Sequence, residues 1–328
     1  GYRYLQDYDL GLPLDIKNSR HPLKKSMELG PRDRLSQAFI KEREQEKTIP
    51  GPFGDVVHLD IRHLGRKKID KKLPFVRELA KNYAGIDPVY EPIPVRPVVH
   101  YMMGGIDTNI DCSTILPGLF AAGECACVSI NGANRLGSNS LTEILVYGAR
   151  AGQTAAVFAS EHSEINLEAL EKQGADEYKR ITRDFLQKDG GSERIATLRK
   201  EMHQVMEQSV DIFRSESGLK EACNKIEELK DRFSSILIED KSLNFNTELT
   251  SALELENMID VAESIIFSAL SRRESRGSHQ RTDFVNRDDE NFLRHSLAYR
   301  TEAESRIEYQ DVVITKWPPA ERIYGKEE

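Results

Sequence analysis

Hydrophobic side chains in the middle of the chain recur at the spacing of an α-helix. The clearest run follows the i, i+3, i+4, i+7 pattern of one buried face: Leu253, Met258, Ile259, Ala262, Ile265, Ile266, Ala269 and Leu270. Residues 165–188 and 194–214 repeat this pattern with more charged positions. Eleven prolines lie between Pro13 and Pro117, and none follows until Pro318. Because proline breaks a helix interior, the roughly two hundred residues between are predicted to be largely helical.

The regions on either side mix helix and strand patterns. Gly30 and Pro31 predict a helix whose first residue is Pro31, with an apolar face formed by Leu35, Ala38 and Phe39. Three further segments have strand or extended character, the last of them ended by prolines: a strand at 55–64, an extended linker followed by a strand at 91–101, and a strand at 306–317. The whole pattern predicts an α+β protein.

Composition narrows the class of protein. The chain has 328 residues, of which 39% are hydrophobic and 30% charged, as in folded globular proteins of roughly two domains. It contains no apolar run of about 18 residues, so no transmembrane helix is expected. The net charge of −8 is spread without acidic or basic blocks. This argues against a nucleic-acid partner and against attraction to an anionic membrane surface.

The four cysteines, at positions 112, 125, 127 and 223, have no metal-ligand spacing. We therefore expect no metal site and reduced thiols, as in a cytosolic compartment. The chain starts at Gly1 without a visible signal peptide, and we expect that this is not the natural start.

The segment 129–141, SINGANRLGSNSL, places Arg135 among small residues. Small residues let the backbone approach a ligand closely, and a lone arginine among them suggests that the ligand is an anion. Ser140 and Glu143 have the spacing of a capping box, which predicts a helix start there. A helix N-terminus favours anions through its free N–H groups and its dipole. The alternative is that Arg135 forms a structural salt bridge.

Three other positions are candidates for chemistry. Glu124 follows a short apolar strand that ends in glycine, so its carboxylate could accept a ribose-type hydroxyl, or it could be a surface residue. His100 ends an extended segment before Gly104, either as a ligand contact or as a packed histidine. Arg32 lies in a first helical turn, where the dipole disfavours it, so some other group should hold it. The alternative is a surface ion pair with Asp33, worth at most about 1 kcal/mol.

Taken together, the motifs resemble one family. They are, in chain order, GYRYLQDYDLG, MELGPRDRLSQAF, GDVVHLDIRHLG, DPVYEPIPVRPVVHYMMGGI, GLFAAGECACVSINGANRLGSNSL, SRRESRGSHQR and DVVITKWPPAERIYG. On these segments the chain resembles the flavoprotein subunits of the fumarate reductase and succinate dehydrogenase family, nearer to the quinol-fumarate reductase branch. The resemblance implies four parts: the remainder of a capping domain at 1–98, a returning part of a Rossmann-like FAD-binding domain at 99–160, a helical domain at 161–285, and a small C-terminal domain with strands at 286–328.

The resemblance also implies roles for individual residues. His100 and Arg135 would bind the carboxylates of the substrate, and Arg32 would donate and accept the proton. Glu124, Ser140 and Leu141 would contact FAD, whose reduced ring would pass a hydride to fumarate. Arginine is a poor acid, so Arg32 would need a proton relay, and the family's relay residues lie upstream of the region matched here.

Partners follow from the same resemblance. Electrons would pass through an iron–sulfur subunit to or from quinone held by a membrane anchor, in the tricarboxylic acid cycle or anaerobic respiration. The subunit would lie peripherally on the cytoplasmic face of the inner membrane. Two alternatives stay open: a soluble flavoenzyme similar to L-aspartate oxidase, and a docking fragment without catalysis.

The chain departs from the family pattern in three ways. It has no G-x-G-x-x-G phosphate loop, and it lacks the segment whose histidine carries FAD covalently. Asn131 stands where a histidine often precedes Gly-Ala-Asn-Arg. We therefore expect a C-terminal fragment of a longer subunit, which alone binds FAD weakly or not at all and is inactive.

Overall fold

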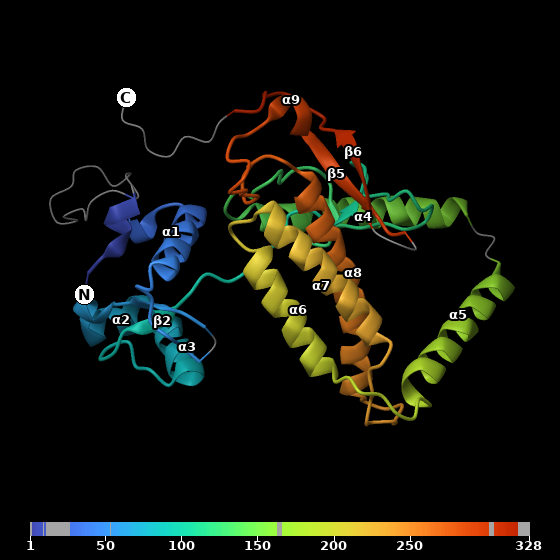
Figure 1. The fold of residues 1–328 in the computed structure, drawn as a ribbon. Coiled ribbons are helices and arrows are strands. Elements are labelled where there is room, and N and C mark those ends of the chain that lie inside the picture. Colours follow the sequence, from blue (N-terminus) through green and yellow to red (C-terminus); the bar gives the residue numbers. More distant parts are fainter. Residues whose placement is uncertain are drawn as a thin grey trace. The chain divides into compact units, whose positions relative to one another are not determined.

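The computed structural model describes residues 2–8, 10, 27–52, 54–162, 166–301 and 305–320. The chain forms two compact units, drawn in Figure 1. The first unit comprises residues 1–100 and 318–328, and the second comprises residues 101–317. The mixed helix and strand content agrees with the predicted α+β class.

The first unit contains short helices and a two-stranded antiparallel sheet. In chain order the elements are η1 (Tyr4–Tyr8), η2 (Met27–Leu29), α1 (Arg32–Glu44), β1 (Val57–Leu59), η3 (Arg62–Leu64), α2 (Gly65–Lys72), α3 (Pro74–Ala84) and β2 (Ile93–Val95). The strands pair with Val57 opposite Val95. A small core of Leu5, Leu10, Met27 and Ala38 packs α1 against the two short 3-10 helices.

Helix α1 confirms the predicted apolar face but begins one residue later than predicted. Pro31 is its N-cap, with extended backbone angles, and Arg32 is the first helical residue. Ala38 and Phe39 are buried, and Leu35 is partly buried. Proline at the N-cap costs no hydrogen bond, because the first N–H groups of a helix lack intrahelical partners.

Two strand predictions in this unit were wrong in extent. The predicted strand 55–64 ends after Leu59, because the carboxylate of Asp60 accepts hydrogen bonds from the backbone N–H and the guanidinium of Arg62. These local bonds turn the chain into η3. The second strand forms at Ile93–Val95, within the segment predicted to be a linker, and residues 98–101 are not a strand.

The second unit begins with a two-stranded parallel sheet and continues as helices. Its elements are β3 (Ile106–Asp107), β4 (Ala126–Cys127), α4 (Asn139–Glu161), α5 (Leu167–Ile181), the π-helical turn η4 (Thr182–Leu186), α6 (Ile195–Ser209), α7 (Glu216–Phe233), α8 (Thr247–Ser271), α9 (Asp289–Phe292), β5 (Arg294–Tyr299) and β6 (Arg306–Asp311). The prediction of a largely helical middle is confirmed. Strand β6 is shorter than predicted, because residues 312–317 do not pair with another strand.

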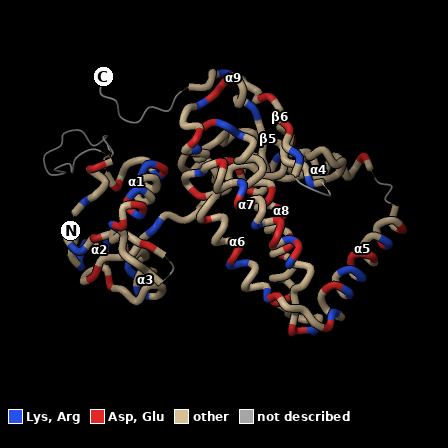
Figure 2. Tube along the Cα trace, in the orientation of Figure 1, with Lys and Arg blue, Asp and Glu red and all other residues tan. Residues whose placement is uncertain are grey.

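Helices α6, α7 and α8 lie side by side and enclose the main core (Figure 1). On α7 the buried side chains Leu219, Ala222, Ile226 and Leu229 follow the helical period, as an amphipathic helix requires. Figure 2 shows acidic and basic positions interspersed along these helices. Helix α5 contributes no buried side chain, and its contact with α8 includes an ion pair between Arg180 and Glu256. None of the helices in the described ranges has the length and apolar character needed to cross a membrane.

Candidate functional site

The loop between β4 and α4 is built from tight turns. Ser129, Gly132 and Ser138 all have positive φ, of 71°, 54° and 66°. Only glycine adopts this region freely, and of the two serines Ser129 has a side-chain partner, His295. The loop delivers Arg135 to the start of α4, as the sequence suggested.

The capping box predicted at Ser140 is wrong. The N-cap is Ser138, whose side chain makes no cap hydrogen bond, and Ser140 already lies in the first turn of α4. Glu143 does not reach back to the helix start, because its side chain is only 2% exposed and is held elsewhere. Its Oε2 accepts hydrogen bonds from the hydroxyl of Tyr101 at 2.9 Å and from the amide of Asn131 at 2.8 Å. The first N–H groups of α4 therefore have no side-chain cap.

Arg135 is positioned by an aromatic ring. Its guanidinium carbon lies 4.5 Å from the centroid of Tyr101, a cation–π contact, and its Nη1 donates to the carbonyl of Leu136 at 3.1 Å. Its Nε is buried without a hydrogen-bond partner. Arg135 forms no ion pair with any carboxylate in the described part of the chain. The alternative of a structural salt bridge is therefore not observed, and the guanidinium keeps donors available for an anion.

A second loop, which includes residues 272–279 and is called the bracing loop below, packs against the loop that carries Arg135. The carbonyl of Ala133 accepts hydrogen bonds from both the backbone N–H and the hydroxyl of Ser278, at 2.9 and 2.8 Å. Gly277 has a φ of +57°, and a Cβ there would lie 2.5 Å from the same carbonyl oxygen. Ser129 contacts Nε2 of His295 on β5 at 2.7 Å. These contacts fix the backbone on both sides of Gly132.

Buried charges stabilise this bracing loop. Glu274 is fully buried and pairs with both Arg272 and Arg276. His279 accepts a hydrogen bond from Arg214 and donates one to the carbonyl of Arg272. Burial, and next the charge of Arg214, lower the pKa of His279 to about 4, so its ring is neutral near pH 7. The bracing loop is thus held by groups that are already satisfied.

Glu124 lies beside the start of α4. A Cβ on Gly123, which has a φ of +83°, would lie 3.2 Å from Ile144 in the first turns of that helix. The carboxylate of Glu124 accepts a hydrogen bond from the backbone N–H of Met102 through Oε1, at 3.1 Å. The side chain is exposed, and Leu141 is 61% exposed. Glu124, Ser140, Leu141 and Arg135 thus belong to one part of the second unit.

Arg32 and His100 belong to the first unit. Arg32 is exposed, and within the described ranges its side chain has no hydrogen bond or ion pair. The expectation that another group holds it is not met there. His100 is exposed, is the last residue of the first unit, and immediately precedes Tyr101.

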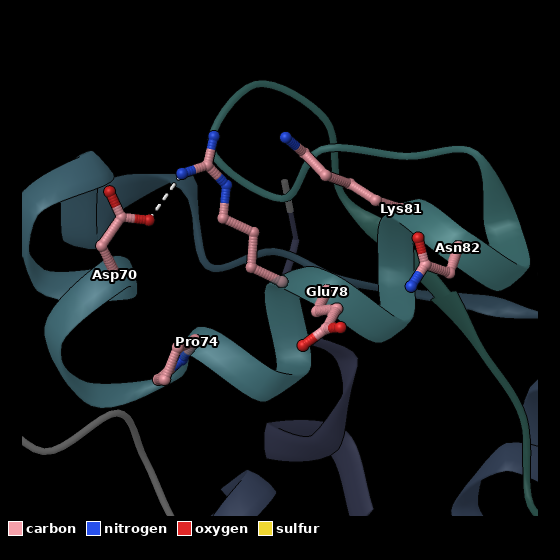
Figure 3. A pocket seen from close by; sticks show the side chains of 6 residues that line it. Asp70, Pro74, Glu78, Lys81 and Asn82 are labelled. Carbon is pink, nitrogen blue, oxygen red and sulfur yellow. Dashed lines mark hydrogen bonds and ion pairs between the residues drawn. The ribbon is translucent and has the colours of Figure 1, made fainter.

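A cavity of about 300 Å³ lies between α2 and α3 in the first unit (Figure 3). It is lined by Asp70, Pro74, Arg77, Glu78, Lys81 and Asn82. Arg77 donates to both Asp70 and Asp87, and its hydrogen bond holds the pKa of Asp87 well below the ordinary range. This ion cluster satisfies its own charges, and the cavity contains no predicted site residue.

Sequence reasoning missed Tyr101 and Glu143. Tyr101 follows His100 directly in the segment DPVYEPIPVRPVVHYMMGGI, and this adjacency is the one feature of the sequence that points to a role for Tyr101. The local sequence around Glu143 predicts half of a capping box, because Tyr101, whose hydroxyl donates to Glu143, is 42 residues away in the chain. In the sequence Asn131 stands out as a departure from the family pattern, and in the structure its amide donates to the same carboxylate.

Comparisons with known proteins agree with these observations. Residues 1–141 match the family model described as FAD binding domain, and residues 199–324 match that described as fumarate reductase flavoprotein C-term. A fumarate reductase flavoprotein subunit of Mycobacterium tuberculosis is 54% identical over 99% of the chain and 56% of its own length. That of Escherichia coli is 49% identical over 100% and 54%. The chain thus spans about half the length of the curated relatives that it matches.

Solved structures of similar proteins superpose on the chain over nearly its whole length. A quinol fumarate reductase structure from E. coli superposes with a TM-score of 0.92 at 49% identity, covering 100% of this chain and 56% of the other. A quinol-fumarate reductase with menaquinol molecules gives 0.91 at 48% identity, covering 98% and 55%.

Proposed function

We propose that this chain, which belongs to the family of fumarate reductase and succinate dehydrogenase flavoproteins, forms part of an FAD-dependent enzyme that interconverts fumarate and succinate. The observation that carries the proposal is Arg135, an arginine that is fixed in place but not neutralised. Its guanidinium lies on the ring of Tyr101, its Nε is buried without a partner, and no described carboxylate pairs with it. A dicarboxylate supplies the anion that this arrangement lacks.

The residues around the start of α4 fit FAD. One oxygen of Glu124 is held by Met102, and the exposed carboxylate keeps capacity to accept a ribose hydroxyl. The start of α4 has no side-chain cap, and its dipole suits a group that carries negative charge beside Ser140 and Leu141. When bound, FAD supplies the hydride acceptor or donor of the reaction.

The remaining roles are assigned to the first unit. His100, like Arg135, binds a carboxylate of the substrate, and Arg32 transfers the proton. Two observations support a functional Arg32: it lies in the first turn of α1, where the dipole disfavours it, and no described group pairs with it. Because arginine has a pKa above about 12, Arg32 must be reprotonated at once by another group.

Partners are proposed from the relatives. Electrons would be exchanged with quinone through an iron–sulfur subunit and a membrane anchor, with the flavoprotein peripheral on the cytoplasmic face of the inner membrane. The solved structures that the chain resembles at TM-scores of 0.92 and 0.91 are quinol-fumarate reductases, and one contains menaquinol. The division into four domains at 1–98, 99–160, 161–285 and 286–328 stays a prediction.

The test uses the full-length gene product with its co-purifying subunits. Flavin oxidation is followed with fumarate in the wild type and in Arg32→Gln, and flavin reduction is followed with L-aspartate. We expect rapid fumarate-dependent oxidation that falls by about a thousandfold or more in the variant, roughly 4 kcal/mol, with flavin still bound. Reduction by L-aspartate without fumarate turnover would favour an aspartate oxidase. Partner binding without flavin or turnover would favour a docking role.

A further inference from the structure

We propose that Tyr101 is a positioning residue that keeps Arg135 from forming an ion pair with Glu143. The inference rests on the proposed function, because it concerns how Arg135 stays available to a substrate carboxylate. Tyr101 contacts both charged residues: its ring faces Arg135, and its hydroxyl donates to Glu143. One side chain therefore holds two opposite charges at different places, Arg135 at its ring face and Glu143 at its hydroxyl.

The first step is that Glu143 is a buried carboxylate whose donors are neutral. Its side chain is 2% exposed, and its Oε2 accepts from the hydroxyl of Tyr101 and the amide of Asn131. A buried carboxylate attracts any cation within reach, because opposite charges interact strongly away from water. Arg135 and Glu143 both contact Tyr101, and Asn131, which also holds Glu143, lies in the same loop as Arg135.

The second step is that Arg135 nevertheless pairs with no described carboxylate. A contact between guanidinium and ring face holds the cation through the quadrupole of the ring, and it leaves the net charge in place. It also leaves the edges of the guanidinium, which carry the N–H donors, free of the ring. Among the described residues, the only acceptor that the guanidinium bonds is the carbonyl of Leu136, which takes Nη1.

The third step is the consequence for a ligand. A carboxylate binds arginine best through two parallel N–H donors at the guanidinium edge. If Glu143 took that edge, a substrate carboxylate would have to displace it at the cost of leaving a buried charge unpaired. The separation by Tyr101 removes this competition. It favours planar carboxylate substrates over ligands that lack a negative charge.

The test compares single and double variants of the full-length gene product with its co-purifying subunits. In Tyr101→Leu the ring and the hydroxyl are both lost, so Arg135 moves onto Glu143, and the KM for fumarate rises roughly tenfold to a hundredfold. In Tyr101→Leu/Glu143→Gln no carboxylate competes, so most of that rise in KM is reversed. Tyr101→Phe keeps the ring, and its KM stays within about threefold of the wild type.

The matched control is Tyr147 on α4, which carries Arg150 at 5.6 Å from its ring centroid. Tyr147→Leu removes a similar cation–π pair from the same unit and should leave the KM unchanged. If Tyr101 mattered only for folding, the KM for fumarate of Tyr101→Leu/Glu143→Gln would be as high as that of Tyr101→Leu, or higher. That outcome would overturn the inference, and so would a KM for fumarate in Tyr101→Phe as high as that in Tyr101→Leu.

A crystal structure of Tyr101→Leu separates this inference from the proposed function. We expect a new ion pair between Arg135 and Glu143 in that variant, with or without a dicarboxylate. Arg135 in an unchanged position would refute the separating role, whatever the activity. If the pair forms but the wild type responds to no dicarboxylate, the proposed function fails while the separating role of Tyr101 stands.

Discussion

Two regions of the second unit use charged and apolar side chains in opposite ways. In the bundle of α6, α7 and α8, apolar side chains form one core. The charges there are paired, and Arg232, for example, forms ion pairs with the three carboxylates of Glu193, Glu201 and Glu228. In α4, which has 23 residues, the only buried side chain is the charged Glu143. Apolar residues there are exposed instead, including Leu141, Ile144 and Leu145.

The difference teaches where stability and chemistry are placed. The bundle buries its apolar core within itself. Nε of Arg199 on α6 is also buried without a partner, but the charge of Arg199 is paired with Glu254. The loop before α4 leaves polar capacity unmet, at Nε of Arg135 and at Oδ1 of Asn131, both buried without partners. Such groups are costly unless something binds them, and the guanidinium of Arg135 also has no ion pair with a described carboxylate, which together favour a ligand site here. The bundle and the bracing loop supply the rigidity that tolerates this cost.

The largest expected effect is on activity and comes from the loop. Arg135→Gln should lower kcat/KM for fumarate by roughly a hundredfold to a thousandfold, because charge-assisted hydrogen bonds to the substrate are lost. Its melting temperature should stay unchanged, since the guanidinium forms no ion pair with a described residue. Arg150→Gln is the matched control and should behave like the wild type in both measurements. A loss of stability in Arg135→Gln would contradict the contrast between the two regions.

The next effect is on stability and comes from the bundle. Leu255 is fully buried in the α6–α8 core, so Leu255→Ala should lower the free energy of unfolding by about 2–5 kcal/mol. Urea unfolding measures the change. The KM for fumarate, measured where the variant is still folded, should not change. Leu170→Ala on the exposed side of α5 is the control, with an expected change within about 0.5 kcal/mol.

A third, smaller effect tests the brace. Gly277→Ala forces a Cβ to within 2.5 Å of the carbonyl of Ala133 at a φ of +57°. We expect a loss of about 1–3 kcal/mol of stability together with a higher KM, because the loop that carries Arg135 must shift. Gly174→Ala in α5 adds a Cβ in open space within a helix, so it should stabilise by about 0.5–1 kcal/mol. An unchanged KM in Gly277→Ala would mean that the brace does not position the loop.

The same contrast explains which features the sequence could predict. Helices α6 and α8 follow from hydrophobic periodicity, because the burial of each residue repeats along its own helix, and α7 lies in the proline-free region predicted to be helical. The cap at Ser140 was predicted wrongly because Tyr101 and Asn131 outcompete the helix start for Glu143. Arg135 could be singled out from its small neighbours, but its ring partner could not. A pairing between distant residues leaves no local pattern in either segment.

The smallest effect concerns the pH dependence of the bundle. Hydrogen bonds from Arg232, and next from Lys225, lower the pKa of Glu201 to about 2. A carboxyl whose pKa is lower in the folded than in the unfolded state stabilises the fold above its unfolded pKa of about 4.3. That contribution declines as the pH falls from there toward 2. Because Glu201 is about a quarter exposed, solvent screening limits the contribution to about 1 kcal/mol.

Glu201→Gln should therefore be less stable than the wild type at pH 7, and the difference should shrink as the pH falls below about 4.5. Urea unfolding at pH 7, 4 and 3 measures this convergence. Glu239, whose one ion pair among the described residues is with Arg194 at a more exposed position, provides the control. Glu239→Gln should show a smaller difference at every pH. A Glu201→Gln variant whose deficit is constant with pH would mean that packing, and not charge, accounts for its effect. The ion pairs of the bundle would then contribute little to its stability. The bundle and the loop would differ only in the unpaired guanidinium of Arg135.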